Sequence, residues 1–261
     1  MHRPPVTWVV PASQWVRHHR AVAHLGAPAL MLALLMALYF SGVAPLQQVV
    51  APSVSFLPPY YWREFGLLEG LQNLCLLVTL LAALSAARVT RLRLDRMLLG
   101  LMMVGALFVL LEETDYGRHF FDLVRGQAGS LDPERWRRNL HSVTMADGQM
   151  LASWFKLAAR LVLVTWFLLL PLLWRPPPGG WVARFLPSRW FTATVMLLLM
   201  VSALAHGLDD RGLGIIHGSQ GNLHKNISEF GELLLYYLAM VYTVETAGRC
   251  VGGAETPDPA E

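Results

Sequence analysis

The sequence predicts an all-helical, polytopic membrane protein with about six transmembrane helices and both termini in the cytoplasm. Hydrophobic residues make up 54% of the 261-residue chain, and the mean hydropathy is +0.42. Charged residues make up only 15%, against about 25% in soluble domains. Residues 97–111 and 161–173 contain no charge at all. A water-facing surface cannot be covered with so few charges, which excludes a soluble enzyme, a disordered chain and a nucleic-acid-binding domain.

Six segments are long and apolar enough to cross about 30 Å of hydrocarbon, which takes about 20 residues. They are Ala27–Leu46, Phe65–Ala87, Met97–Glu113, Met150–Trp174, Trp190–Gly207 and Ile227–Ala247. The long polar segment before the first span favours a retained anchor over a signal peptide. We therefore expect an interfacial segment at 1–26, a six-span membrane domain at 27–247 with an outer loop at 115–149, and a disordered cytoplasmic tail at 248–261.

The distribution of Lys and Arg predicts the orientation, because these residues accumulate in cytoplasmic loops. With the N-terminus inside, the inner segments hold eleven of the 21 basic residues and the outer segments hold eight. The other two, Lys156 and Arg160, lie within the fourth span. This pattern predicts that the polar site faces the outside, which is the periplasm if the membrane is a bacterial inner membrane. His18, His19 and His24 fall in the basic inner segment and are expected to be interfacial charges.

Ionisable residues of several spans fall at one depth. Fifteen residues, Met97–Leu111, precede Glu112 and Glu113, which is roughly 22 Å of helix. Similar counts place Glu69, His206 and Glu232 near the outer edge of the membrane. Charges inside a bilayer are tolerated when they pair, face inward or line a cavity. The sequence therefore predicts a buried Glu, Asp and His cluster that opens to the outside.

Two further patterns belong to this polar layer. Lys156 and Arg160 are spaced i,i+4 and so share one helix face. The third and fifth spans each run into acidic residues, followed by a loop and then the tripeptide Asn-Leu-His, at 139–141 and at 222–224. This order suggests an internal duplication, an arrangement that places sites at the repeat interface in many transporters.

At these residues the chain resembles a family of bacterial polytopic membrane proteins with no assigned activity. Its members have a Glu-rich start to an early span, then Glu-Glu-Ile-Ser-Trp-Gly-Gln, Asn-Leu-His-Asn, and a Glu-rich start to a late span. The corresponding stretches here are Glu64–Glu69, Glu112–Arg118, Asn139–Ser142 and Ser228–Glu232. Tyr116, Arg118 and Ser142 depart from the family pattern. The resemblance supports the site and implies no reaction.

The favoured hypothesis is a metal-dependent hydrolase or transferase acting on a lipid or lipid-linked substrate. His141, His206 and His224 would be ligands of a divalent metal, most simply zinc, with Asp210 as fourth ligand or orienting group. The metal would activate water, and Glu113 would act as general base. Glu112 and Glu69 would support the site, and Lys156 and Arg160 would bind an anionic head group.

Two other hypotheses remain open. A transporter or membrane-complex subunit would use the same polar layer as an ion or proton pathway, or as structural glue between helices. A metal-free intramembrane protease is the third, because Glu112-Glu113 and His206-x-x-x-Asp210 look like the paired motifs of CAAX-type proteases. Membrane lipids are the expected partners, no nucleic acid is expected, and the sequence gives no oligomeric state.

Overall fold

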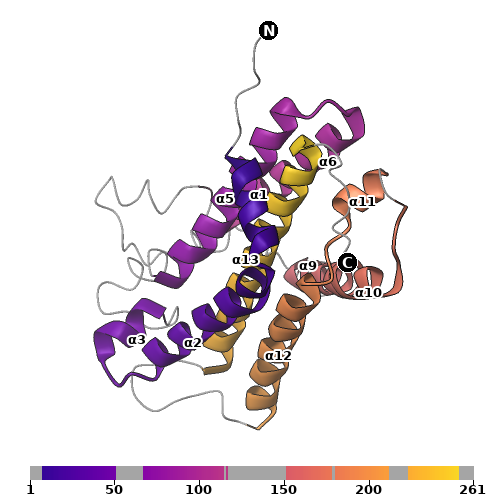
Figure 1. The fold of residues 1–261 in the computed structure, drawn as a ribbon. Coiled ribbons are helices and arrows are strands. Elements are labelled where there is room, and N and C mark those ends of the chain that lie inside the picture. Colours follow the sequence, from indigo (N-terminus) through magenta and orange to yellow (C-terminus); the bar gives the residue numbers. More distant parts are fainter. Residues whose placement is uncertain are drawn as a thin grey trace, which may run out of the picture.

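The computed structural model describes residues 8–50, 67–114, 116, 151–177, 180–211 and 223–252 (Figure 1). Helices are the only regular elements within these ranges, which confirms the all-helical class. They are α1 (Val9–His18), a π-helical turn η1 (Val22–Gly26), α2 (Ala27–Tyr39), α3 (Ala44–Val50), α5 (Leu67–Val89), α6 (Arg93–Glu113), α9 (Leu151–Val162), a second π-helical turn η4 (Leu163–Leu169), α10 (Leu170–Leu173), α11 (Trp181–Phe185), α12 (Phe191–Asp210) and α13 (Leu223–Gly252).

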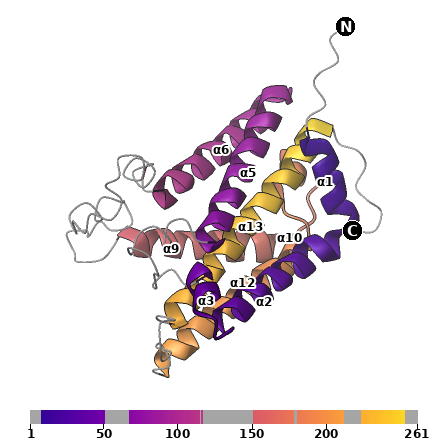
Figure 2. The ribbon, with the colours of Figure 1, turned by 90° about the vertical axis from the view of Figure 1, so that its left-hand side faces the viewer.

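Helix α13 is the axis of the fold. It packs against α1, α5 and α12, while α6 packs mainly on the far side of α5 (Figures 1 and 2). With 30 residues, α13 is about 45 Å long, which exceeds the hydrocarbon thickness of a bilayer. Its side chains Phe230, Leu233, Leu234 and Leu238 are buried in the main core cluster. The other helices therefore take their positions from α13.

The helices at the N-terminal end run antiparallel to α13 along almost its whole length. Ser13 of α1 lies against Gly248, and Tyr39 at the end of α2 stacks edge-on against Phe230 with ring centroids 6.4 Å apart. The N-terminal helices therefore cover α13 from Phe230 to Gly248. Figure 2 shows α1 beside the C-terminal end of α13 and α2 further along it.

Five of the helices are long and apolar enough to cross a membrane. They are Val22–Tyr39, Leu67–Val89, Arg93–Glu113, Phe191–Leu208 and Ile227–Gly252. Their outer faces are apolar: Leu101 and Met97 of α6 are 68% and 64% exposed. Such exposed aliphatic surface suits lipid rather than water.

The first span begins and ends earlier than the sequence predicted. The helix runs to Tyr39 rather than Leu46, because the chain turns at Gly42, which has a φ of 71°. Glycine has no Cβ and adopts this left-handed conformation without strain. Residues Ala44–Val50 form the separate helix α3. The start moves from Ala27 to Val22, so His24 belongs to the span.

The fourth predicted span differs most from its prediction. The segment is helical from Leu151 to Leu173, but seven of its residues form the π-helical turn η4. Its apolar part, Leu157–Leu173, is shorter than the five spans above. In Figure 2 this helix lies across the direction of α13 rather than along it. Trp166 donates a hydrogen bond to the Tyr242 hydroxyl at 3.1 Å, which joins the segment to α13.

The predicted start of the disordered tail at residue 248 is also wrong. Helix α13 continues to Gly252, and Ala247 and Gly248 are buried. Helix α1 packs on these last turns of α13. The two helices approach so closely at Gly248 that only a small residue fits there. A Cβ at Gly248 would overlap the Cβ and Oγ of Ser13. Residues 253–261 lie outside the described part of the chain.

We predict that Gly248→Ala destabilises the protein by about 1–3 kcal/mol, the usual cost of overpacking a close contact. The added methyl meets the rigid Cβ of Ser13, so α1 must move away from α13. Thermal unfolding in detergent measures the effect. The double variant Ser13→Gly/Gly248→Ala should recover much of the loss, since it removes the opposing atoms. Equal destabilisation of single and double variants would contradict this packing.

Candidate functional site

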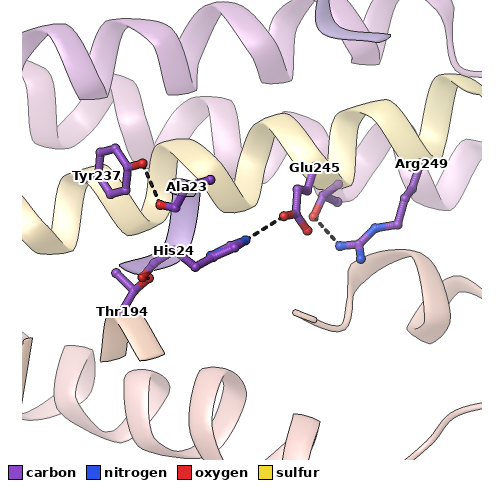
Figure 3. Close-up of polar contacts among 7 residues, drawn as sticks. Ala23, His24, Thr194, Tyr237, Glu245 and Arg249 are labelled. Carbon is purple, nitrogen blue, oxygen red and sulfur yellow. Dashed lines mark hydrogen bonds and ion pairs between the residues drawn. The ribbon is translucent and has the colours of Figure 1, made fainter. Parts of the chain in front are cut away.

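His24 lies at the centre of a buried polar site and not at the membrane surface. The expectation of an interfacial charge is wrong, because His24 is 1% exposed. Its Nε2 lies 2.9 Å from Oε1 of Glu245 on α13, and the two side chains are 1% and 5% exposed. These residues are 221 positions apart in the sequence. Figure 3 shows the imidazole of His24 reaching across to the carboxylate.

The local backbone explains why His24 sits in a π-helical turn. Pro28 follows four residues later and has no N–H to donate to the carbonyl of His24 or of Ala23. Hydroxyl groups from two other helices supply hydrogen bonds to these carbonyls. Thr194 of α12 donates to the His24 carbonyl at 2.7 Å, and Tyr237 of α13 donates to the Ala23 carbonyl at 2.7 Å. These bonds satisfy backbone groups that lipid could not satisfy.

The same contacts fix the imidazole. The ring of Phe191 packs edge-on against His24 with centroids 4.4 Å apart. Thr194 and Tyr237 hold the backbone at His24 and Ala23, and the imidazole points toward Glu245 (Figure 3). One turn beyond Glu245, Arg249 donates to the Thr246 hydroxyl at 3.1 Å. The site is therefore a preorganised acid–imidazole pair held by three helices.

A second polar group lies nearer the other end of α13 and includes part of the predicted layer. Tyr236 donates a hydrogen bond to Oε1 of Glu113 at 2.5 Å, which joins α13 to the end of α6. Glu229 and Glu232 also interact electrostatically with the Tyr236 hydroxyl. Gln72 of α5 donates to the Glu229 carbonyl at 3.3 Å. Polar residues of three helices thus meet at this level of α13, with Glu113 among them.

His206 and Arg160 form a separate contact. Nη2 of Arg160 lies 3.2 Å from Nε2 of His206, and both side chains are exposed. A guanidinium only donates, so the imidazole accepts through Nε2 in this contact. The fourth segment and α12 thus bring these two residues into contact. The contact also uses the lone pair that a metal bound at Nε2 would need.

The remaining predicted site residues have varied positions. Glu112 accepts a hydrogen bond from the Tyr116 hydroxyl, Glu69 is half-buried in the first turn of α5, and Asp210 is exposed at the end of α12. His141 lies outside the described residues. Lys156 and His224 lie in helices, but their side chains are outside the described part.

No metal centre is preformed in the part of the chain that the structure describes. Its His, Cys, Asp and Glu side chains contain no group of three or more that could hold a metal ion. The two cysteines, Cys75 and Cys250, are free thiols. The proposed ligands His141 and His224 are not among the side chains covered by this observation.

Along α13, the two polar groups lie at different heights, and seven residues separate Tyr237 of the first from Glu245 of the second. Glu229, Glu232 and Tyr236 are followed by Tyr237, which contacts the residue before His24, and then by Glu245. Glu229 and Glu245 are sixteen residues apart, or roughly 24 Å along a helix. That is most of the thickness of the bilayer core. The arrangement places ionisable side chains at two heights of one membrane-spanning helix.

The fold and this site define a multi-pass helical membrane protein with ionisable groups buried among its spans. Comparisons with known protein families, with curated proteins and with solved structures found no match. The family resemblance therefore depends on its quoted motifs alone. The functional argument has to start from the buried polar contacts.

The sequence does contain a signal for the pair that was missed. Glu245 comes directly after the uncharged run from Leu233 to Val244 and is followed by Thr246 and Ala247. His24 lies four residues before Pro28 inside the apolar run that starts at Ala21. An acid and a histidine within two apolar helices are candidates for pairing. Counting Glu245 as the inner end of the sixth span hid this possibility.

We predict that Tyr237→Phe and Thr194→Val each destabilise the protein by about 1–3 kcal/mol. Each change leaves a backbone carbonyl of the π-helical turn without its hydroxyl donor, at a cost of that order. Thermal unfolding in detergent gives the measurement. Tyr116→Phe is the matched control, because the Tyr116 hydroxyl lies on the exposed surface.

A double-variant test separates this explanation from simple loss of packing. Pro28→Ala restores an N–H four residues after His24, so the carbonyl of His24 gains a backbone donor. The cost of Thr194→Val should therefore fall in the Pro28→Ala background. If the cost stays the same, the hydroxyl bond does not compensate for the proline.

Proposed function

We propose that this protein moves protons, or a solute coupled to protons, across the membrane along α13. The observation that carries the proposal is the buried pair His24–Glu245, at 2.9 Å and almost without solvent contact. Imidazole and carboxylate groups inside membrane helices commonly serve as proton carriers. This function is the non-catalytic alternative considered from the sequence, now with a specific pair at its centre.

The path would begin at the acidic group around Tyr236 and end at Glu245. Glu113, Glu229 and Glu232 supply carboxylates at the first end, and Tyr236 bonds to one of them. Tyr237 follows directly on α13 and bonds to the carbonyl beside His24. Protons would pass between these groups by side-chain motion or through water. In the predicted orientation the Glu113 end faces the periplasm of a bacterial inner membrane.

The free energy of burying the His24–Glu245 pair supports a role for it beyond stabilising the fold. A buried ion pair loses so much hydration that apolar residues of similar volume are often equally stable or better. Breaking such a pair by removing one partner, in contrast, costs about 3–5 kcal/mol. The fold could therefore be kept with two apolar side chains, and the retention of His24 and Glu245 is better explained by proton exchange.

Both termini lie in the cytoplasm only if the chain crosses the membrane an even number of times. Five helices in the described part of the chain meet the length and hydropathy of a span, and the α9–α10 segment is the proposed sixth crossing. A reporter fused after Gly252 would give the side of the C-terminus directly. A periplasmic reporter would correspond to five crossings.

We predict that Glu245→Gln lowers proton flux by at least roughly tenfold, since a relay that lacks one carrier faces an apolar interior. The assay uses liposomes containing purified protein, a potassium gradient with valinomycin, and a trapped pH-sensitive dye. Glu245→Asp should keep part of the flux, because the carboxylate remains. Thr79→Val is the matched control: Thr79 is equally buried, and its hydroxyl bonds within its own helix.

The double variant His24→Leu/Glu245→Leu distinguishes a pair that carries protons from a pair that only stabilises the packing of helices. It removes both partners, so the folded protein should be about as stable as the natural one, while flux should disappear. A double variant that folds and still conducts would refute the pathway. The absence of flux from the natural protein under any gradient would refute it equally.

The metal-dependent hydrolase is the second candidate, acting on a lipid or lipid-linked substrate with zinc as the preferred metal. The contact between Arg160 and His206 favours it, because an anion-binding group lies 3.2 Å from a proposed ligand. His141, His224 and Asp210 would complete the ligand set and Glu113 would act as base. The His206 imidazole would have to leave Arg160 or use Nδ1.

The two candidates predict opposite results for Asp210→Asn. Asp210 is exposed and lies outside the series along α13, so the proton pathway predicts unchanged flux. The hydrolase predicts lost activity and lower metal content. Elemental analysis of the purified protein beside His206→Ala/His224→Ala provides the measurement: about one metal per chain, lost in the variant, is the expected result for a site with this ligand set.

A further inference from the structure

The tip of the hairpin between α5 and α6 carries a dense group of arginines. Residues 88–96 contain Arg88, Arg91, Arg93 and Arg96, and all four are exposed. We call these four residues the arginine tip. Two leucines alternate with them, Leu92 and Leu94, and these are 51% and 39% exposed. The tip thus presents guanidinium groups and aliphatic side chains together at the end of two membrane-spanning helices.

The one acid of this segment does not neutralise the tip. Asp95 is 0% exposed, and both its oxygens face Arg184 of α11, with Nη2 at 2.9 Å and Nε at 2.7 Å. This ion pair, hydrogen-bonded through Nη2 and Oδ1, balances the charge of Asp95 within the fold. The positive charge of the four tip arginines remains on the surface as a result.

The tip is also held in one shape. Thr90 donates to the Cys250 carbonyl at 3.3 Å, which fixes the turn to the end of α13. Arg96 donates to the Thr90 carbonyl at 2.9 Å and so folds back over the turn. A charged group on a fixed turn loses less conformational freedom on binding than one on a free chain.

The position of the tip determines what reaches it. It ends α5 and α6, and α6 is the most exposed of the spanning helices, with 17% of its apolar window buried. In a membrane the exposed face of α6 therefore contacts lipid, and a tip at the end of this spanning helix lies at the height of the lipid head groups. Arginine side chains at such a height extend along apolar surface and place their charge among the phosphates.

We propose that the arginine tip binds the head groups of anionic phospholipids in the adjacent leaflet. Phosphate oxygens match the planar guanidinium fork of Arg91 and Arg93, and Leu92 and Leu94 enter the acyl region between them. This proposal is independent of the proton pathway, because it uses none of the residues along that path.

The test is lipid binding by the full-length protein in neutral detergent. Dioleoylphosphatidylglycerol and dioleoylphosphatidylcholine are titrated separately, and bound lipid is counted by native mass spectrometry. The natural protein should bind the anionic lipid more tightly than the zwitterionic one. Arg91→Gln/Arg93→Gln should lower the affinity for phosphatidylglycerol by roughly fivefold for each arginine and leave phosphatidylcholine binding unchanged.

The control variant removes the same charge elsewhere. Arg175→Gln/Arg211→Gln replaces two exposed arginines outside the hairpin and should bind phosphatidylglycerol as the natural protein does. Arg91→Lys/Arg93→Lys should keep most of the binding, and it covers the case in which the glutamine variant does not fold. Inorganic phosphate at millimolar concentration should not displace the lipid.

Three results would overturn the proposal. The first is equal binding of the two lipids by the natural protein, and the second is an equal loss of phosphatidylglycerol binding in the control variant. The third concerns the acidic residues Glu255, Asp258 and Glu261, which follow α13 in the sequence. If the natural chain binds no anionic lipid and a chain ending at Gly252 does, the tail and not lipid occupies the tip.

Discussion

The antiparallel packing of the N-terminal helices on α13 is the constraint on which the rest of the structure depends. It is made by contacts of different kinds along its length: the close approach of Ser13 to Gly248, the pair His24–Glu245, and the ring contact of Tyr39 with Phe230. The three contacts all fit one antiparallel register. Helices α5 and α12 then pack on the faces of α13 that remain.

Within this interface, an interruption of the backbone hydrogen bonds and the buried His24–Glu245 pair occur at the same place. Pro28 removes an N–H from the helix, and the carbonyls of Ala23 and His24 turn to hydroxyl groups of α13 and α12. π-Helical turns are rare and are often found at functional sites. Here the turn aims an imidazole at a buried carboxylate, and the hydroxyl bonds make that conformation compatible with an apolar surrounding. The hydroxyl bonds that satisfy the turn therefore also fix the backbone that carries the imidazole.

The sequence predicted part of the polar group around Tyr236 but did not predict the His24–Glu245 pair. Counting residues from the end of the third span brings Glu113 to the polar layer, and the structure places it against Tyr236 beside Glu229 and Glu232. Arg160 and His206 are likewise in contact. Estimating depth in the membrane from residue number missed His24, because the predicted start of the first span at Ala27 left this residue outside the span. Nothing in the local sequence says which of several acids would be its partner.

The sequence by itself determined the class of protein, since low charge and long apolar runs leave a lipid-facing helical bundle as the only stable solution. It also determined most of the span positions, because helical rise relates residue number to depth. The tertiary structure decided which side chains meet. Pairing depends on the rotation of each helix about its axis and on its neighbours, and those follow from close packing at positions such as Gly248 and from the satisfaction of free carbonyls at Ala23 and His24. For that reason the His24–Glu245 pair, 221 residues apart in the chain, became visible only in the folded protein.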